Sequence, residues 1–179
     1  MTDLSALLDR SRIFTEQFDA GDLAIPPRLS TIILTCVDAR VDPAHLFALE
    51  LGNALVIRNT GGWITPGVLT DLAILGVLAA NWPGNVRPEL VVIHHTDCGM
   101  ARLANPEIQE QVAERLHLTV DEVAAMAITD PTTTVRNDIE RLRNTPEIPD
   151  QLVVSGLVYD VADGTLTEVV PPAPLRVTT

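Results

Sequence analysis

Residues 31–41 read TIILTCVDARV, and this stretch decides the fold of the chain. Its apolar run ends at Cys36, and two polar residues, Asp38 and Arg40, follow at alternate positions. An apolar run bounded by a polar turn is typical of a strand that is buried on both faces of a sheet. In open α/β sheets, chemistry collects just beyond the carboxyl ends of such strands. We therefore predict a buried strand that carries reactive side chains at its end.

A second stretch has the same design. Residues 90–99 read LVVIHHTDCG, an apolar run that ends in His95 and is followed by Cys98. Because Cys36 and Cys98 are far apart in the sequence, only adjacent strand ends can bring both to one metal ion. We therefore predict that the strand ending at Cys36 and the strand ending at His95 are neighbours in one sheet.

The composition limits the size and the partners of the protein. The chain has 179 residues, 46% of them hydrophobic, and a mean hydropathy of +0.22. This predicts a single domain over residues 1–179, either a well-buried α/β protein or an oligomer. With 24 acidic and 12 basic residues the net charge is −12, and no local basic cluster offsets it. Such a surface repels a phosphate backbone, so we expect no nucleic-acid partner.

The sequence predicts neither a targeting segment nor a membrane span. The N-terminus carries Asp3 and Asp9 and lacks a basic start followed by an apolar run. The longest apolar helix candidate, residues 68–80, is interrupted by Asp71 and is too short to cross a bilayer. We therefore expect a cytoplasmic protein without a membrane partner.

The N-terminal segment, residues 1–25, is predicted to form a helical arm. The apolar side chains of residues 2–18 fall on one helical stripe, namely Leu4, Leu7, Leu8, Phe14 and Phe18, and Gly21 is a stop signal. Pro26-Pro27 separates this arm from the first strand. The arm can pack on its own domain or reach across to another subunit, and we favour the subunit contact.

Helical and strand patterns alternate along the rest of the chain. Helix starts are marked by Asp42-Pro43, Thr65-Pro66, Asn105-Pro106, Thr119 with Glu122, and Asp130-Pro131. The first of these helices is expected to end near Gly52. Strands are expected over residues 54–57, 152–159 and 166–170, the last two joined by a turn at Asp163-Gly164. The fold class is therefore α/β, a mainly parallel sheet with flanking helices and an antiparallel edge strand.

Two thiols and one imidazole at neighbouring strand ends indicate a zinc site. Zinc takes Cys and His ligands tetrahedrally, and three protein ligands leave the fourth position for water. The alternatives are a single disulfide, which the reducing cytosol disfavours, and buried inert thiols. A purely structural zinc is usually closed by four protein ligands, and the chain has no third cysteine. We therefore interpret Cys36, His95 and Cys98 as ligands of a catalytic Zn2+ ion.

Asp38 is predicted to act beside this metal. Two thiolate ligands reduce the polarisation of the zinc-bound water. A carboxylate that accepts a hydrogen bond from the zinc-bound hydroxide would help to orient that hydroxide toward a substrate. Arg40, two residues on, can hold that carboxylate ionised and oriented. The alternative for Asp38 and Arg40 is an ordinary ion pair at the start of a loop.

Three motifs resemble the β-class carbonic anhydrases, in their compact prokaryotic branch. They are Cys36-Val-Asp-Ala-Arg40, Arg58-Asn-Thr-Gly-Gly62 and His94-His-Thr-Asp-Cys-Gly-Met100, within a resemblance that runs from about Ser30 to Tyr159-Asp160. The resemblance implies a zinc ion held by Cys36, His95 and Cys98, an Asp38–Arg40 dyad and a parallel sheet. It also implies a homodimer embraced by the N-terminal helices. The hydrophobic composition and the arm tethered by Pro26-Pro27 likewise suggest a homodimer, or a dimer of dimers. In some members the aspartate of the first motif replaces water on zinc, which makes Asp38 a fourth ligand in a closed, acidic form.

The implied activity is the reversible hydration of CO2 to bicarbonate by a zinc-bound hydroxide. Carbonyl sulfide (COS) and carbon disulfide hydrolases belong to the same superfamily, so hydrolysis of one of those molecules is the alternative. A further alternative is a homologue without catalytic activity that binds zinc or an anion. The presence of both Asp38 and Arg40 favours an enzyme. Thr60 stands where many members have Ala, and Trp63 and Pro66-Gly67 also differ from the residues expected there. These differences concern the pocket lining and leave the metal ligands intact.

Other histidines and glycines receive simpler interpretations. His94 should point to the opposite face of its strand from His95, as a packed residue or one that supports the ligands. His45 and His117 are placed on helices, as solvent-facing or structural residues. We expect tight backbone at the rim of the site, at Gly61, Gly62 and Gly99. The less favoured alternative is that the N–H groups of these glycines bind an anion.

Overall fold

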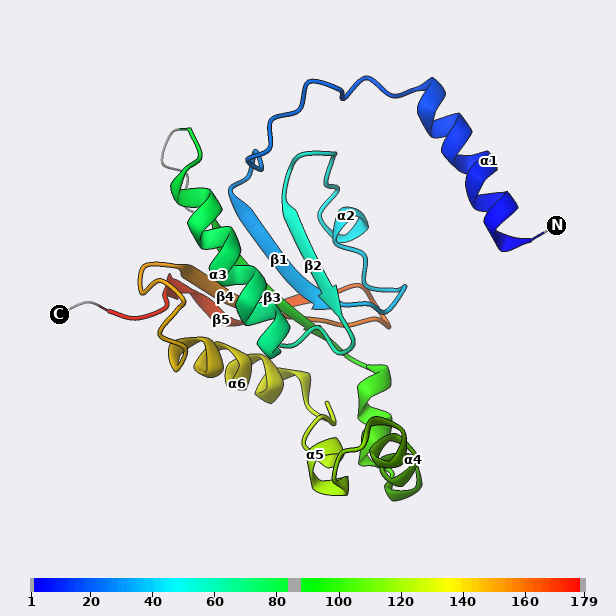
Figure 1. Ribbon diagram of the computed structural model, residues 1–179, viewed down its shortest axis with the longest axis vertical. Helices are drawn as coiled ribbons and strands as arrows, with labels where there is room; N and C mark the ends of the chain where they lie inside the picture. Colours follow the sequence, from blue (N-terminus) through cyan, green and yellow to red (C-terminus); the bar gives the residue numbers. More distant parts are fainter. Residues whose placement is uncertain (1, 84–87, 178–179) are drawn as a thin grey trace.

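The computed structural model describes residues 2–83 and 88–177 of the chain. Five strands form one sheet in the order β2-β1-β3-β4-β5 (Figure 1). They are β1 (Thr31–Cys36), β2 (Leu55–Asn59), β3 (Glu89–His95), β4 (Val153–Tyr159) and β5 (Leu166–Pro174). Strands β1 to β4 are parallel, and β5 is antiparallel to β4. The predicted α/β class, with its mainly parallel sheet and antiparallel edge strand, is confirmed.

The helices begin where the sequence signals indicated. They are α1 (Asp3–Glu16), α2 (Pro43–Leu46), α3 (Pro66–Ala80), α4 (Pro106–Leu116), α5 (Val120–Ala124) and α6 (Pro131–Arg143), and a 3-10 helix, η1, spans Gly99–Ala104. At the start of α2, α3, α4, α5 and α6, the predicted cap accepts a hydrogen bond from a backbone N–H of the first turn; the caps are Asp42, Thr65, Asn105, Thr119 and Asp130. Each cap satisfies a donor that has no partner within the helix.

Strands β1 and β3 are neighbours, as the metal hypothesis required. Their register pairs Thr35 with Ile93, and the buried Thr35 hydroxyl donates to the carbonyl of Ile93 at 3.0 Å. Because the two strands run parallel, both of their carboxyl ends lie at the same edge of the sheet. Cys36 and His95 are the last residues of these two strands.

Helices α3 and α6 cover one face of the sheet and form the main core with it (Figure 1). The strands contribute Ile32, Leu34, Leu90, Val92 and Val154, and the helices contribute Val68, Leu72, Val135, Ile139 and Leu142. Burying each of these side chains is worth about 1.5–3 kcal/mol. A slip of one residue would turn the apolar side chains of a strand to the opposite face, so this core also sets the register that places the site residues.

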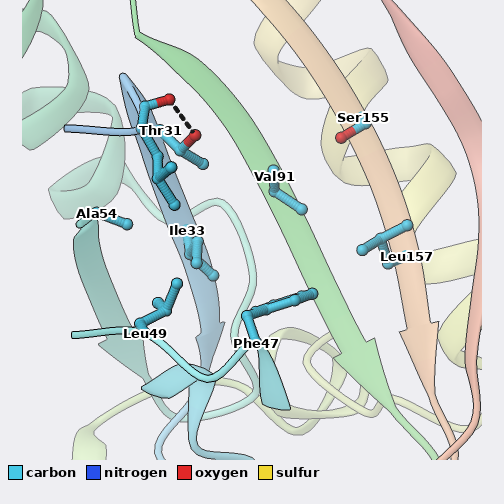
Figure 2. Close-up of a pocket in the computed structure, with 9 residues that line it drawn as sticks. Thr31, Ile33, Phe47, Leu49, Ala54, Val91, Ser155 and Leu157 are labelled. Carbon is cyan, nitrogen blue, oxygen red and sulfur yellow. Dashed lines mark hydrogen bonds between the residues drawn. The ribbon is translucent and has the colours of Figure 1, made fainter. Parts of the chain in front are cut away.

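The opposite face of the sheet carries an open apolar groove of about 290 Å³ (Figure 2). Its floor is formed by Thr31 and Ile33 of β1, Val91 of β3, and Ser155 and Leu157 of β4. Its rim is formed by Leu29, Phe47, Leu49 and Ala54. The groove is apolar surface of the kind that an oligomer covers.

Helix α1 stands apart from the sheet at the end of an extended segment (Figure 1). None of its residues is buried, and Leu4, Leu7 and Phe14 are 63%, 61% and 54% exposed. Among the described residues, no helix is long and apolar enough to cross a lipid bilayer.

Predicted and observed element boundaries differ most at three places. Helix α1 ends at Glu16, before Gly21. Helix α2 ends at Leu46 and does not continue to Gly52, since Ala48 takes a φ of +48° and turns the chain toward β2. Strand β5 continues beyond residue 170 to Pro174, because its pairing with β4 extends to Val153.

Candidate metal centre

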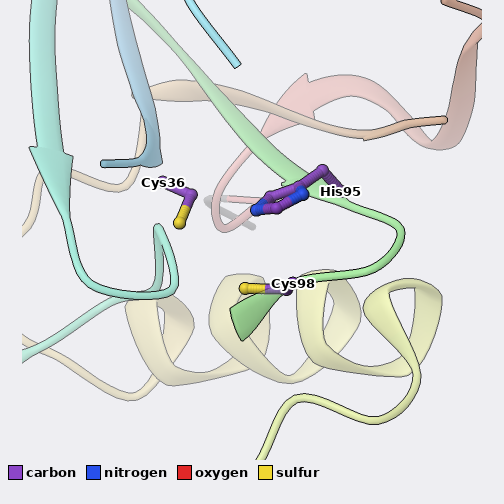
Figure 3. Close-up of side chains that lie close together, drawn as sticks. All are labelled: Cys36, His95 and Cys98. Carbon is purple, nitrogen blue, oxygen red and sulfur yellow. The ribbon is translucent and has the colours of Figure 1, made fainter. Parts of the chain in front are cut away.

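The three predicted ligands lie together at the ends of β1 and β3 (Figure 3). Cys36 ends β1, His95 ends β3, and Cys98 follows β3 after a two-residue turn. One ligand atom from each side chain lies within 4.8 Å of those of the other two, and all three residues are buried. Two sulfur atoms and one imidazole nitrogen at this spacing suit a single zinc ion, which binds sulfur at about 2.3 Å and nitrogen at about 2.0–2.1 Å.

The imidazole of His95 is arranged as a metal ligand would be. Its Nδ1 lies 2.9 Å from the carbonyl oxygen of Thr96, so this nitrogen carries the proton and donates it. Its Nε2 is buried and has no hydrogen-bond partner among the described residues. A buried acceptor without a partner is costly, and metal-binding histidines commonly donate their other nitrogen to a carbonyl in this way. The residues present therefore fit a metal ion.

The two thiols share one negative charge. The pKa of Cys36 is lowered to about 4, chiefly because Cys98 donates a hydrogen bond to its thiolate, and burial only partly opposes this. The pKa of Cys98 is raised, because that same bond holds its proton and because it is buried. Burial lowers the pKa of His95, but the Cys36 thiolate outweighs it and the net direction is upward. A cation bound here would displace the remaining thiol proton, and the two thiolates would then offset its positive charge.

Arg58 holds the backbone that follows Cys36. Its Nε donates to the carbonyl of Cys36 at 3.0 Å, and its Nη2 donates to the carbonyl of Asp38 at 2.7 Å. The turn after β1 would otherwise leave these two carbonyls without strand partners. Arg58 thus fixes the direction in which the chain leaves the first ligand.

Two glycines close the loop after β2 against the first ligand. Gly62 has a φ of +71°, and a Cβ on it would overlap the backbone nitrogen of Cys36. Gly61 has a φ of +89°, and its backbone hydrogen bond helps to lower the pKa of Cys36. The expectation of tight backbone is therefore confirmed for Gly61 and Gly62, whereas a Cβ on Gly99 would meet nothing within 4 Å.

Asp38 and Arg40 form the predicted pair beside the three ligands. Arg40 donates from its Nε to Asp38 Oδ1 at 3.0 Å and from its Nη2 to Asp38 Oδ2 at 2.8 Å. The Arg40 side-chain hydrogen bonds hold the pKa of Asp38 well below its usual range, and the pKa of Arg40 is raised in turn. Asp38 is therefore an ionised acceptor with a fixed orientation. It lies outside the group of ligand atoms that are within 4.8 Å of one another.

Asp97 is a second partner of Arg40 that the sequence analysis did not single out. Arg40 Nη1 donates to Asp97 Oδ2 at 2.7 Å, and this bond lowers the pKa of Asp97. The residue lies inside the HHTDCGM motif, between His95 and Cys98. Its place in that motif was visible in the sequence, but its partner was not.

Apolar side chains form a wall on one side of the thiols. Ile128 is buried against Cys36 and Cys98, and Met100 packs beside it. Ile128 comes from the loop between α5 and α6, so local sequence patterns offered no signal for this contact. Trp63 is stacked under Arg141 of α6, whose guanidinium carbon lies 5.2 Å from the ring centroid. The ring is therefore packed within its own chain.

The remaining histidines lie away from the trio. His94 points to the opposite face of β3 from His95, as predicted, where its Nε2 lies 2.8 Å from Oδ2 of the buried Asp138. His45 lies on α2 with an exposed side chain. His117 is exposed too, but it caps the end of α4 with a φ of +56° and is not within the helix.

Comparisons with known proteins agree on one family. Residues 31–166 match the family described as carbonic anhydrase. Beta-carbonic anhydrase 1 of Mycobacterium tuberculosis is 30% identical over 151 residues, which cover 84% of this chain and 88% of that protein. The solved carbonic anhydrase of Streptococcus mutans has a TM-score of 0.80 and 32% identity, and the match covers 94% of this chain and 98% of that one.

A relative with another activity also matches. A carbon disulfide hydrolase of an Acidianus species is 25% identical over 160 residues, which cover 76% of each chain.

Proposed function

Because this chain belongs to the β-class carbonic anhydrase family, we propose that it catalyses the reversible hydration of CO2 to bicarbonate at a zinc ion held by Cys36, His95 and Cys98. The observation that carries the proposal is the His95 Nε2 atom, which is buried without a partner among the described residues and belongs to a ring that faces two thiols (Figure 3). A zinc ion there would supply a water-derived nucleophile near neutral pH and would polarise the oxygen atoms of the substrate.

The chain itself would orient the attacking group. Asp38 is ionised and can only accept hydrogen bonds, so an O–H group beside it would be turned with its proton toward the carboxylate and its lone pair toward the substrate. Arg40 keeps that carboxylate in one rotamer through two donors. Ile128 and Met100 provide an apolar surface beside the thiols, which suits a small molecule without hydrogen-bond donors.

The test is a comparison of substrates on purified, zinc-loaded protein. Stopped-flow measurements should give a higher kcat/KM for CO2 hydration than for COS hydrolysis. A higher value for COS would reverse the assignment. In that case Trp63→Ala would show whether the loop after β2 sets the preference, because its ring stacks on Arg141 and borders the loop of Gly61.

Hydrolysis of COS or carbon disulfide is the second candidate. Two observations favour it: one relative is a carbon disulfide hydrolase, and the wall beside the thiols is apolar. In each turnover, CO2 hydration must transfer a proton to the buffer, and this requires a polar path out of the site. COS hydrolysis tolerates a less polar entrance to the site. The ion pair of Asp38 with Arg40, whose side chains are 18% and 47% exposed, supplies polar surface at the site, and on this ground we place CO2 first.

Arg40→Ala should reduce activity without removing zinc. The substitution releases Asp38 from its two side-chain hydrogen bonds but leaves the three metal ligands in place. Changes of this kind typically cost about 10- to 100-fold in activity or metal affinity. Zinc per chain and kcat/KM should be measured on the same samples, with the exposed Arg115→Ala as the control. Loss of zinc in Arg40→Ala would contradict a supporting role.

Acidification should close the site. Asp38 remains ionised in mildly acidic solution because its pKa is depressed, whereas hydroxide, its competitor for the metal, becomes scarcer as the pH falls. We therefore expect high activity at alkaline pH, and at acidic pH a form in which Asp38 leaves Arg40 and becomes the fourth zinc ligand. Crystal structures at both pH values would check this. An alkaline structure with Asp38 on zinc and Arg40 unpaired would refute it.

The protein is expected to assemble as a homodimer or a dimer of dimers. The arm and the groove both present apolar surface that a monomer would leave exposed. Deleting residues 1–25 should give an aggregated or unstable protein, and Phe14→Ser should lower the mass measured by light scattering. Arg12→Ser is the control on the same helix, because Arg12 forms an exposed ion pair with Asp9 of the same helix. A soluble, active monomer after the deletion would contradict the role of the arm.

A reducing compartment such as the cytoplasm suits this site. The two cysteines are free, and their sulfur atoms lie within 4.8 Å of each other. In an oxidising compartment this proximity would favour a disulfide over metal binding.

A further inference from the structure

Arg40 is held from two sides. Beyond its bonds to Asp38, its Nη1 donates to the Asp97 carboxylate at 2.7 Å and its Nη2 donates to the Asp97 carbonyl at 2.9 Å. The guanidinium therefore joins the turn after β1 to the turn after β3. These two turns carry Cys36 on one side and His95 with Cys98 on the other.

The backbone of Asp97 is shaped for this contact. Its φ is +52°, in the left-handed region that residues other than glycine seldom adopt, although Asp and Asn adopt it more readily than most. In this conformation the residue offers its carbonyl and its carboxylate to one guanidinium. Unusual backbone of this kind persists where the surrounding structure enforces it, and it often accompanies a functional site.

We propose that Asp97 is a positioning residue that clamps Arg40 and thereby keeps Asp38 oriented beside the metal ligands. The proposal rests on the function proposed above, and Asp97 acts only through Arg40. Arg40 has a long side chain that is 47% exposed, and without a second anchor it could carry Asp38 with it into other rotamers. Asp97 is 79% exposed, and ion pairs this exposed add little to folding stability. Its effect is therefore expected on orientation and on turnover.

The variants separate charge from backbone. Asp97→Asn keeps the shape and the tolerance of a positive φ but loses the negative charge. Asp97→Gly keeps the backbone conformation and removes the side chain altogether. Asp163→Asn is the control, because Asp163 is also exposed, but its carboxylate accepts a hydrogen bond from the backbone N–H of Thr165 in the turn between β4 and β5 and not from Arg40.

The first readout is the mobility of Arg40 itself, in zinc-loaded protein labelled with 15N-arginine. The Arg40 Nε–H signal, assigned by its loss in Arg40→Lys, should exchange with water several-fold faster in Asp97→Asn and Asp97→Gly than in the wild type or Asp163→Asn. Unchanged exchange in both Asp97 variants would overturn the proposal. This readout does not need turnover, so it decides the clamp even if the substrate assignment fails.

The second readout is a double-mutant cycle. Asp97→Asn should lower kcat/KM for the better substrate by about 3- to 10-fold, less than the about 10- to 100-fold expected for direct supports of a ligand. Zinc content and melting temperature should not change. In the Arg40→Ala background, Asp97→Asn should not lower kcat/KM further, because the effects of substitutions at interacting residues are not additive. Additive losses would show that Asp97 acts independently of Arg40 and would overturn the proposal.

Discussion

Replacing either Cys36 or Cys98 with serine should abolish zinc binding and activity together. These are the only cysteines of the chain, and both sulfur atoms belong to the ligand group. A serine hydroxyl does not ionise near neutral pH and cannot replace a thiolate, so each variant keeps only two of three ligands. Since metal binding requires deprotonated ligands and contributes directly to folding, the loss should also lower stability.

The measurement is zinc per chain after dialysis, alongside the melting temperature. The wild type should retain about one zinc per chain, as expected for a site with three protein ligands, and each variant close to none. Chelation of the wild type should lower its melting temperature, because the ion joins the ends of β1 and β3. His45→Ala, which changes an exposed histidine outside the group, is the control and should keep its zinc. Zinc retained in both cysteine variants would rule out this ligand set.

Gly62→Ala should prevent or severely weaken folding. The new Cβ would overlap the backbone nitrogen of Cys36 and would lie 2.6 Å from the carbonyl carbon of Thr35. Neither atom can withdraw, because β1 is hydrogen-bonded between β2 and β3. The left-handed backbone adds about 1–2 kcal/mol, and overpacking adds typically about 1–3 kcal/mol.

Gly164→Ala is the matched control for this substitution. Its φ of +81° is similar, but a Cβ there would meet nothing within 4 Å. In urea unfolding, the free energy of unfolding of Gly164→Ala should therefore fall only by the cost of the left-handed backbone conformation. Equal destabilisation of the two variants would mean that the contact with β1 has no energetic weight.

Local chemistry made much of this structure predictable. The caps of α2 to α6 were predicted because each acts within its own first turn, and β1 and β3 were predicted because their apolar runs are nearly continuous. The ligand trio followed from residue types at two strand ends. The ends of α1 and α2 were misplaced, and the end of α2 depends on the positive φ of Ala48.

The sequence by itself determined the fold class, the three candidate ligands and the pairing of Asp38 with Arg40, because strand pattern, ligand type and a two-residue spacing are local properties. Only the tertiary structure decided that Arg40 also contacts Asp97, that Arg58 holds the carbonyls after Cys36, and that Ile128 covers the thiols. The arginine contacts join residues 20 to 57 positions apart in the sequence, and Ile128 likewise lies far along the chain from both cysteines. They depend on strand order, register and left-handed backbone, which no local pattern encodes.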